Sequence, residues 1–508
     1  MKGEDVEYIT HKIMETSKLT RTLGMREGIT ITTGTVVGVG IFTVGANCVG
    51  ILGSSVIIYT LIAMIICIFP AMMYAEMGAM LPYAGGTYEY AKRAINKPIA
   101  NIAAWHYIIA IIAACASEAL AFSNYFSWIL SGLGIDITID TRIIAFVLMA
   151  FFIAINFRGI KMSSRWQNGF VAFFWAASSI WMFYMIRNVD TANFIPSQFA
   201  EIPGFRDAVL LITYLWWCFA GFETVVGMGG EIRFPQINIP RTLLLSPLLI
   251  FSVSALFQYF LIGVVPTDLL GSIADAEAPY AQGLKMAGYV GFPLVFLCIA
   301  IAFGGDLSTM NPGIAAPSRY IFQMGSDHVL PELFGRVHKD FKTPFIAVLF
   351  VGIVAFMLIL TNSIVIIAEI SICSLFWCYI IGFFSFLSLR KNEPELKRPY
   401  KMPFGIFGAV ISMAIYVIMM LNLGARYFAL SCIITAVCLL FYFFYSRKHS
   451  LSGEELRSIR DAEASELEED HPSDQERAAM NREFKAWRLI VAALFLFTIG
   501  IYLFSFVR

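Results

Sequence analysis

Three glycines interrupt the first long apolar stretch of this chain, which contains the run Gly34-Thr-Val-Val-Gly38-Val-Gly40-Ile-Phe42. Each glycine costs a helix about 1 kcal/mol relative to alanine, so this stretch is poorly suited to a continuous helix. In a bilayer, a broken helix exposes N–H and C=O groups that water cannot reach. Such a break persists only where it is buried in protein or lines a polar cavity. The break is therefore a candidate binding site.

A second interrupted stretch follows five apolar segments later, at Trp217-Cys-Phe-Ala-Gly-Phe-Glu223. A matched pair of interrupted helices in two halves of a chain is typical of the substrate site of secondary transporters. Glycines that serve only close helix packing are the alternative explanation, which accounts for one glycine-rich helix better than for two in corresponding places.

The composition indicates an integral membrane protein. Of the 508 residues, 58% are hydrophobic and only 14% are charged, and the net charge is zero. This composition lies outside the range of soluble proteins and gives no reason to expect a nucleic acid partner. The nine cysteines lie in apolar segments without a Cys-x-x-Cys pair, so we expect small buried thiols and neither a disulfide framework nor a metal site. No cofactor is expected.

Thirteen apolar segments of membrane-spanning length divide the chain. Lys and Arg gather in every second loop, which predicts a cytoplasmic N-terminus and, with an odd number of spans, an external C-terminus. The segments are about 30–52, 54–80, 99–131, 142–157, 166–186, 207–230, 241–265, 290–318, 345–361, 363–389, 404–424, 427–446 and 487–507.

Because the interrupted segments are numbers one and six, the first ten segments are expected to form two repeats of five with opposite orientation. The predicted domains are a cytoplasmic segment at 1–29, a transport core at 30–389, helices 11 and 12 at 390–446, a charged cytoplasmic linker at 447–486 and an extra membrane helix at 487–508. The linker is expected to be a solvated helix and connection, or else a regulatory or partner-binding element.

Four motifs, in order, resemble those of the amino acid/polyamine/organocation (APC) transporter superfamily, over the first twelve segments. The resemblance implies a LeuT-type fold with broken helices 1 and 6. Two departures are Phe234-Pro235, where the family usually has Asn-Pro, and the thirteenth segment. The motifs are 34–42, Tyr74 to Arg93 with Glu76 and Gly85-Gly86, Gly221 to Arg241, and Ser318-Arg319 through Asp327 to Pro344.

The breaks suggest how an amino acid would be bound. We expect the N–H groups of Gly38, Val39 and Gly40, at the start of a half-helix, to bind a carboxylate. Carbonyls around Thr35, Val36, Phe219 and Ala220 are expected to accept hydrogen bonds from an ammonium group, and Phe222 is expected to contact the substrate side chain.

The resemblance further implies that Trp217 is an aromatic lid over the substrate and Glu223 an acid on the inward path; core filling is the alternative for Trp217. Acids within membrane segments are costly and are therefore functional candidates. Glu118, Glu223, Asp306 and Glu369 could pair with a substrate cation or carry a proton, or form hydrogen bonds between helices.

The residues leave open whether transport is driven by exchange, by protons or by sodium ions. Segment 166–186 has no Lys or Arg where proton-coupled relatives often carry a lysine, which leaves that position vacant, as expected of an exchanger. Alternatively, Ser308 and Thr309 could offer oxygens to Na⁺. We favour exchange or proton coupling.

The expected function is secondary active transport of amino acids or related amines across the cell membrane by alternating access, with lipid and a small-molecule substrate as partners. A sodium-coupled symporter and a transport-deficient amino acid sensor or receptor are the alternatives. Two matched helix breaks are not expected of a channel. The chain also lacks the His-x-x-x-His and Gly-x-Ser-x-Gly motifs that are typical of a membrane enzyme.

Overall fold

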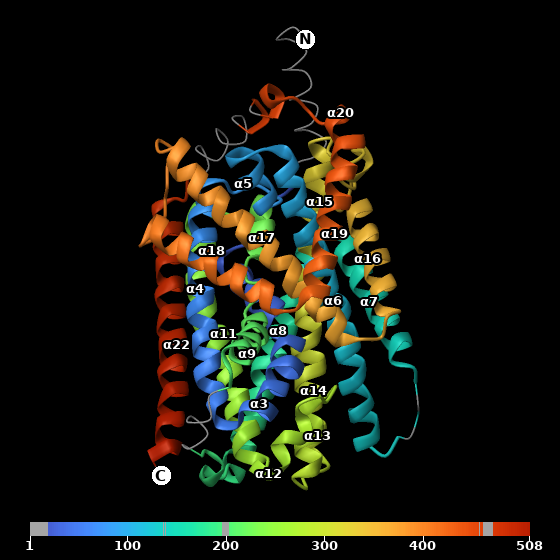
Figure 1. Ribbon diagram of the computed structural model, residues 1–508, viewed down its shortest axis with the longest axis vertical. Coiled ribbons are helices and arrows are strands. Elements are labelled where there is room, and N and C mark those ends of the chain that lie inside the picture. The colour runs from blue at the N-terminus through green and yellow to red at the C-terminus, as the bar shows by residue number, and fades with distance from the viewer. Residues whose placement is uncertain are drawn as a thin grey trace.

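The computed structural model describes residues 19–135, 137, 139–195, 203–456, 458–460 and 471–507, and these form helices and no strand. Most of the predicted N-terminal segment and residues 461–470 of the predicted linker lie outside the described residues. The long helices stand side by side as one bundle (Figure 1). They are α4 (Val56–Met80), α6 (Lys97–Gly132), α8 (Ile160–Met185), α11 (Pro235–Val264), α15 (Leu307–Ser326), α17 (Ile364–Asn392), α18 (Gly405–Asn422), α19 (Ala425–Phe441) and α22 (Asp474–Val507).

Shorter helices complete the bundle and its two ends. The α-helices are α2 (Met25–Val36), α3 (Ala46–Leu52), α5 (Thr87–Ala94), α7 (Thr141–Phe157), α9 (Phe205–Trp217), α10 (Thr224–Gly227), α12 (Thr267–Leu270), α13 (Pro279–Met286), α14 (Phe292–Ile299), α16 (Phe345–Ile359) and α20 (Arg447–His449). Three π-helical segments are η1 (Gly40–Gly45), η8 (Ala300–Asp306) and η10 (Tyr442–Ser446). The 3₁₀ segments are η2 (Gly53–Ser55), η3 (Ile186–Asn188), η4 (Thr191–Asn193), η6 (Gly229–Glu231), η7 (Gly271–Ile273) and η9 (Glu332–Gly335).

By length and composition, nine helical stretches within the described residues can cross a membrane, which makes this a multi-pass membrane protein. Predicted segments one and two contribute a single long stretch, because the chain stays helical from Gly40 to Met80. The segment at 207–230 is divided by its interruption into α9 and α10, while α7 and α16 have only 17 and 15 residues. These features explain why fewer long spans are found than the thirteen apolar segments predicted.

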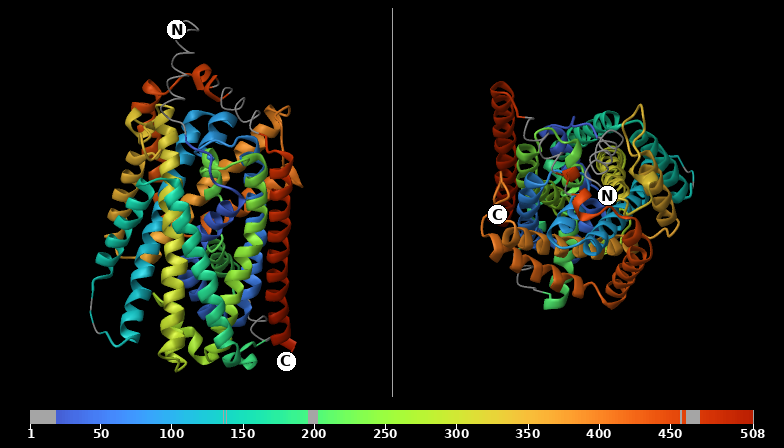
Figure 2. Two further views of the ribbon diagram at one scale, coloured as in Figure 1. Left: turned by 180° about the vertical axis from the view of Figure 1, so that it is seen from behind. Right: turned by 90° about the horizontal axis from the view of Figure 1, so that it is seen from above.

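The centre of the bundle is formed by α11 against α4 and by α17 against α6, with α15 also packed on α6. Most residues of α11 are buried inside the bundle. The C-terminal helix α22 packs on α11 at the edge of the molecule, as both views in Figure 2 show. This helix therefore adds to the outside of the bundle and leaves its centre unchanged.

A buried ion pair joins α15 to η6, near the end of the bundle where α5 lies (Figure 1). Arg319 of α15 donates to both carboxylate oxygens of Glu231, at 2.9 and 2.8 Å, and both side chains are 1% exposed. The N–H groups of Thr22 and Leu23 donate to the Glu231 carbonyl at 2.9 and 3.0 Å. The segment before α2 is therefore joined to the segment after α10, next to α15.

A second charged cluster lies at the same end. Asp327, which follows α15, accepts hydrogen bonds from Tyr88 at 2.8 Å and from Lys92. Arg460 approaches it to 3.7 Å and donates to Glu89 at 3.0 Å. Burial alone would raise the pKa of Asp327, but Lys92 and Arg460 outweigh burial and lower it. The described part of the linker is thus bound to the bundle through Arg460.

The buried pair predicts a large loss of stability on substitution of Arg319. In Arg319→Gln, the Glu231 carboxylate stays buried without its cation, and breaking such a pair costs about 3–5 kcal/mol. We expect the variant to melt at a clearly lower temperature than the wild type in a detergent thermal-denaturation assay.

The control is Arg142→Gln, which breaks the exposed pair between Arg142 and Asp140. Water already solvates both of these groups, so we expect little change in melting temperature. Equal melting temperatures for the two variants would contradict the stabilising role of Arg319.

Candidate functional site

The first interruption lies at residues 37–39. Helix α2 ends at Val36, and η1 begins at Gly40. The Gly38 N–H donates to the Val36 carbonyl at 3.0 Å. The Gly38 carbonyl accepts hydrogen bonds from the N–H groups of Ile41 and Phe42, each at 2.9 Å. The chain is therefore helical on both sides of a short non-helical link, in the middle of the glycine-rich motif.

The second interruption lies at residues 218–223, between α9 and α10. Its turns are closed by hydrogen bonds from Ala220 N to Trp217 O at 3.1 Å and from Thr224 N to Gly221 O at 3.0 Å. Gly221 has φ +108°, which an L side chain rarely adopts, so glycine is needed at the centre of this link.

The two interruptions touch each other. The Cys218 thiol donates to the Gly40 carbonyl, with 2.9 Å between sulfur and oxygen. A Cβ added at Gly221 would lie 2.9 Å from the Thr35 methyl carbon, and one added at Gly40 would lie 3.3 Å from the Cys218 Cα. Glycines thus allow the two interruptions to approach each other closely, and the predicted residues Thr35 and Gly40 lie at these contacts.

Glu118 of α6 places a carboxylate directly on the first interruption. Both of its oxygens lie 2.9 Å from the Val39 nitrogen and accept its N–H. A Cβ at Gly38 would be 2.3 Å from one of these oxygens, so only glycine leaves room for the carboxylate. In this conformation the N–H groups of Gly38 and Val39, expected to bind a substrate carboxylate, both have partners in the protein.

Asp306, the last residue of η8, faces Glu118. The two carboxyl groups interact electrostatically, and Asp306 and Glu118 are 0% and 3% exposed. Neither oxygen of Asp306 has a hydrogen-bond partner in the part of the chain that the structure describes. Two ionised carboxylates repel each other, so this contact becomes a hydrogen bond only when the pair holds a proton.

Glu223 lies inside the second interruption. Its Oε2 accepts from the Tyr379 hydroxyl at 2.5 Å and from the Gly221 N–H at 3.2 Å. Its Oε1 has no hydrogen-bond partner among the described residues, although the side chain is 1% exposed. Glu223 therefore has a free acceptor position in the protein interior.

Aromatic side chains surround the second interruption. The Trp217 indole donates to the Ser371 hydroxyl of α17 at 3.4 Å, and the Phe222 ring centre lies 6.2 Å from that of Tyr379. Trp217, Phe219 and Phe222 are all buried. Glu369, on the same helix as Ser371, accepts from Tyr214 at 3.0 Å and makes no contact with the Glu118–Asp306 pair.

Ser308 and Thr309 belong to a cluster of oxygens beside the first interruption. Ser308 donates to the carbonyls of Gly305 at 2.7 Å and Gly34 at 3.3 Å. Thr309 donates to those of Gly34 at 2.8 Å and Val37 at 3.4 Å. Two hydroxyls and three carbonyls are therefore gathered in one place, and all are hard ligands of the kind that Na⁺ prefers.

Comparison with known families decides the class of this protein. The model of the amino acid permease family matches residues 23–444. The chain belongs to this family. Membership indicates a transporter and not an enzyme, and the matched range includes both interruptions and every predicted site residue.

Characterised relatives of this permease carry different substrates. It is 28% identical to the methylthioribose transporter of Bacillus subtilis, over 86% of this chain and 96% of the relative. It is 25% identical to the branched-chain amino acid permease BcaP of the same species, over 85% and 94% of the two chains. The serine/threonine exchanger SteT of Bacillus subtilis is 23% identical, over 79% and 90%.

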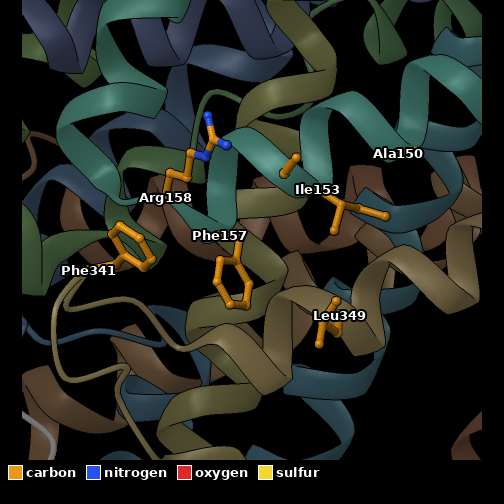
Figure 3. A pocket seen from close by; sticks show the side chains of 7 residues that line it. Ala150, Ile153, Phe157, Arg158, Phe341 and Leu349 are labelled. Atoms are coloured by element: carbon orange, nitrogen blue, oxygen red, sulfur yellow. The ribbon is translucent and has the colours of Figure 1, made fainter.

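One hollow lies away from the interruptions. A cavity of about 380 Å³ lies between α7, α16 and the loop before α16, with mostly apolar walls (Figure 3). Arg158 is the one charged residue that lines it, so the cavity does not provide for both charges of an amino acid. Its lining residues are Ala150, Ile153, Ala154, Phe157, Arg158, Phe341 and Leu349.

Sequence reasoning missed three residues that shape this site. Cys218 bonds the first interruption, Tyr379 bonds Glu223, and the Tyr125 hydroxyl donates to the Phe42 carbonyl at 2.7 Å. The Cys218 and Tyr379 pairs are separated by more than 150 residues. Cys218 lies within the second interrupted stretch, but nothing in the stretch indicates its partner, and Tyr379 and Tyr125 lie outside the four motifs. Only the packing of the helices reveals these contacts.

The geometry predicts that Gly38→Ala disables the permease. The added methyl group must displace the Glu118 carboxylate from the first interruption, so we expect amino acid uptake into proteoliposomes to fall by about tenfold or more, which corresponds to about 1.4 kcal/mol.

The control is Gly169→Ala in α8, where an added Cβ meets nothing within 4 Å. Alanine there favours the helix, so uptake should be unchanged. Wild-type uptake by Gly38→Ala would show that the contact between Gly38 and Glu118 is not needed.

Proposed function

We propose that this permease is a secondary active transporter of amino acids or related amines that works by alternating access. The observation that carries the proposal is the contact between the two interruptions, at Gly40–Cys218 and Thr35–Gly221. Backbone groups freed at such breaks are the usual means of binding a charged substrate in mid-membrane.

We further propose the architecture that this mechanism needs. Residues 30–389 form two inverted repeats of five helices, with helices 11 and 12 at 390–446, a cytoplasmic linker at 447–486 and a last membrane helix at 487–508. The alternation of basic and acidic loops supports a cytoplasmic N-terminus. On this assignment the end of the bundle with Arg319 and Glu231 faces the cytoplasm.

The substrate is held chiefly by backbone groups in this proposal. The N–H groups of Gly38, Val39 and Gly40 receive its carboxylate, and the carbonyls of Thr35, Val36, Phe219 and Ala220 receive its ammonium group. Trp217 covers the bound molecule, Phe222 contacts its side chain, and Glu223 lies below it with a free oxygen.

Coupling is proposed to be exchange or proton symport. Buried acids at the first interruption support proton symport, and the name of the related serine/threonine exchanger supports exchange. Sodium symport is the second candidate, favoured by the oxygens gathered around Ser308 and Thr309.

Transport by the reconstituted protein tests the proposal. Purified permease in liposomes is given labelled L-isoleucine, L-serine, L-threonine, L-glutamate or methylthioribose, with and without internal substrate, a pH gradient or a sodium gradient. We expect saturable uptake of at least one amino acid, driven by internal substrate or by a pH gradient. An absence of saturable uptake for the whole panel would contradict the proposal, and binding without uptake would favour a receptor.

Replacement of external Na⁺ by choline tests the sodium candidate. We expect no change in uptake. If uptake instead requires Na⁺, the protein is a sodium symporter, and Thr309→Ala should remove the requirement. Ser412→Ala is the matched control, because its hydroxyl donates only within α18, to the Gly408 carbonyl at 2.8 Å.

A further inference from the structure

We propose that Glu118 and Asp306 form the proton-coupling site of this permease, and that Glu118 and the substrate carboxylate compete for the N–H of Val39. This inference rests on the proposed transport function and specifies how a proton is linked to the substrate. When the pair takes up a proton, Glu118 leaves the first interruption, and the Val39 N–H becomes available to the substrate carboxylate.

The competition follows from the position of Glu118. Its two oxygens share the Val39 N–H at 2.9 Å each, and they occupy the space that the missing side chain of Gly38 leaves open. This N–H lies directly before η1, where the positive end of a helix binds anions. A substrate carboxylate needs the same donor, so the two carboxylates exclude each other.

The need for a shared proton follows from burial. Glu118 and Asp306 are 3% and 0% exposed, and the Asp306 oxygens have no hydrogen-bond partner among the described residues. Two like charges so close in the protein interior cannot both persist, and in such pairs one proton is normally shared. The resting pair therefore holds one proton and one negative charge.

Among the described residues, no cation near Glu118 and Asp306 neutralises the negative charge of this pair. In the described residues, the titratable groups that interact with it are the Cys115 thiol and the Tyr125 hydroxyl of α6. Cys298 of α14 and Tyr280 of α13 lie beside Tyr125. No basic side chain interacts with either carboxyl group there, and residues 166–186, on the neighbouring α8, contain no Lys or Arg.

The coupling step conserves charge. A second proton, from the external water, adds to the Glu118 carboxylate and makes the pair neutral. A neutral carboxyl group is a weaker acceptor than a carboxylate, so the Val39 N–H becomes available to the substrate. The substrate carboxylate then brings back one negative charge. After the change of access, the substrate and the proton leave to the internal water, one proton for each substrate molecule.

Substrate binding at different pH values tests this step. The probe is the amino acid with the fastest uptake among L-isoleucine, L-serine, L-threonine and L-glutamate. For the wild type, we expect its affinity to rise as pH falls, by up to about tenfold for each pH unit, with one proton taken up from a weakly buffered solution for each molecule bound.

Glu118→Gln mimics a permanently protonated Glu118. We expect its affinity to be independent of pH, without proton uptake on binding and without accumulation driven by a pH gradient. Asp306→Asn keeps one titrating carboxyl group, so binding should still take up a proton, but with a shifted pH midpoint. Ser412→Ala is the control, because the Ser412 hydroxyl donates within α18 to the Gly408 carbonyl at 2.8 Å, and this variant should keep the wild-type profile.

Several results would overturn the inference. They are a pH-independent affinity of the wild type, proton-coupled uptake by Glu118→Gln, and an unshifted midpoint in Asp306→Asn. The wild-type proton count decides the question even if Glu118→Gln does not fold. Exchange of amino acids with pH-independent affinity would overturn the inference alone, whereas failure of all uptake and binding would overturn the proposed function as well.

Discussion

Backbone groups that leave a helix inside a membrane need partners in the protein, because lipid offers none. The structure meets this constraint at both interruptions. Val39 donates to Glu118, Gly40 accepts from Cys218, and Gly221 donates to Glu223. Glu118 comes from a distant helix, Cys218 comes from the opposite interruption, and Glu223, two residues from Gly221, is itself bonded by Tyr379 of α17. The site therefore exists only when the surrounding helices are in place.

The same partners explain why an interrupted helix is not simply a weak point. The carboxylate of Glu118 occupies a position suited to an anion, and the Val39 N–H offsets part of the cost of its burial. Such a bond can be exchanged for a similar bond to a ligand at little net cost. When no substrate is bound, the polar backbone groups of the site form hydrogen bonds within the protein. The site can therefore open and close without leaving unpaired N–H or C=O groups inside the membrane.

The local features of the fold could be predicted from the sequence. Glycine lowers helix stability wherever it stands, so both interruptions could be located at Gly38–Gly40 and near Gly221 from residue type alone. Hydropathy likewise predicted a multi-pass membrane protein. The number of long helices was less predictable, because it depends on where a helix such as α9 stops and on whether the chain stays helical through Gly53.

Contacts between distant segments could not be predicted. Glu118 was recognised as a costly buried acid, but its bond to Val39 joins residues 79 positions apart. The Tyr379 bond to Glu223 and the Cys218 bond to Gly40 span even longer separations. These pairs depend on how helices pack, and helix packing is not determined by composition or motif spacing.

The most direct test of the account is an experimental structure of the permease in a lipid nanodisc with a transported amino acid bound. The account predicts the substrate between residues 37–40 and 218–222, with its carboxylate on the Val39 N–H and Glu118 moved away from it. Substrate bound elsewhere, or bound here while Glu118 still accepts from Val39, would contradict the central claim.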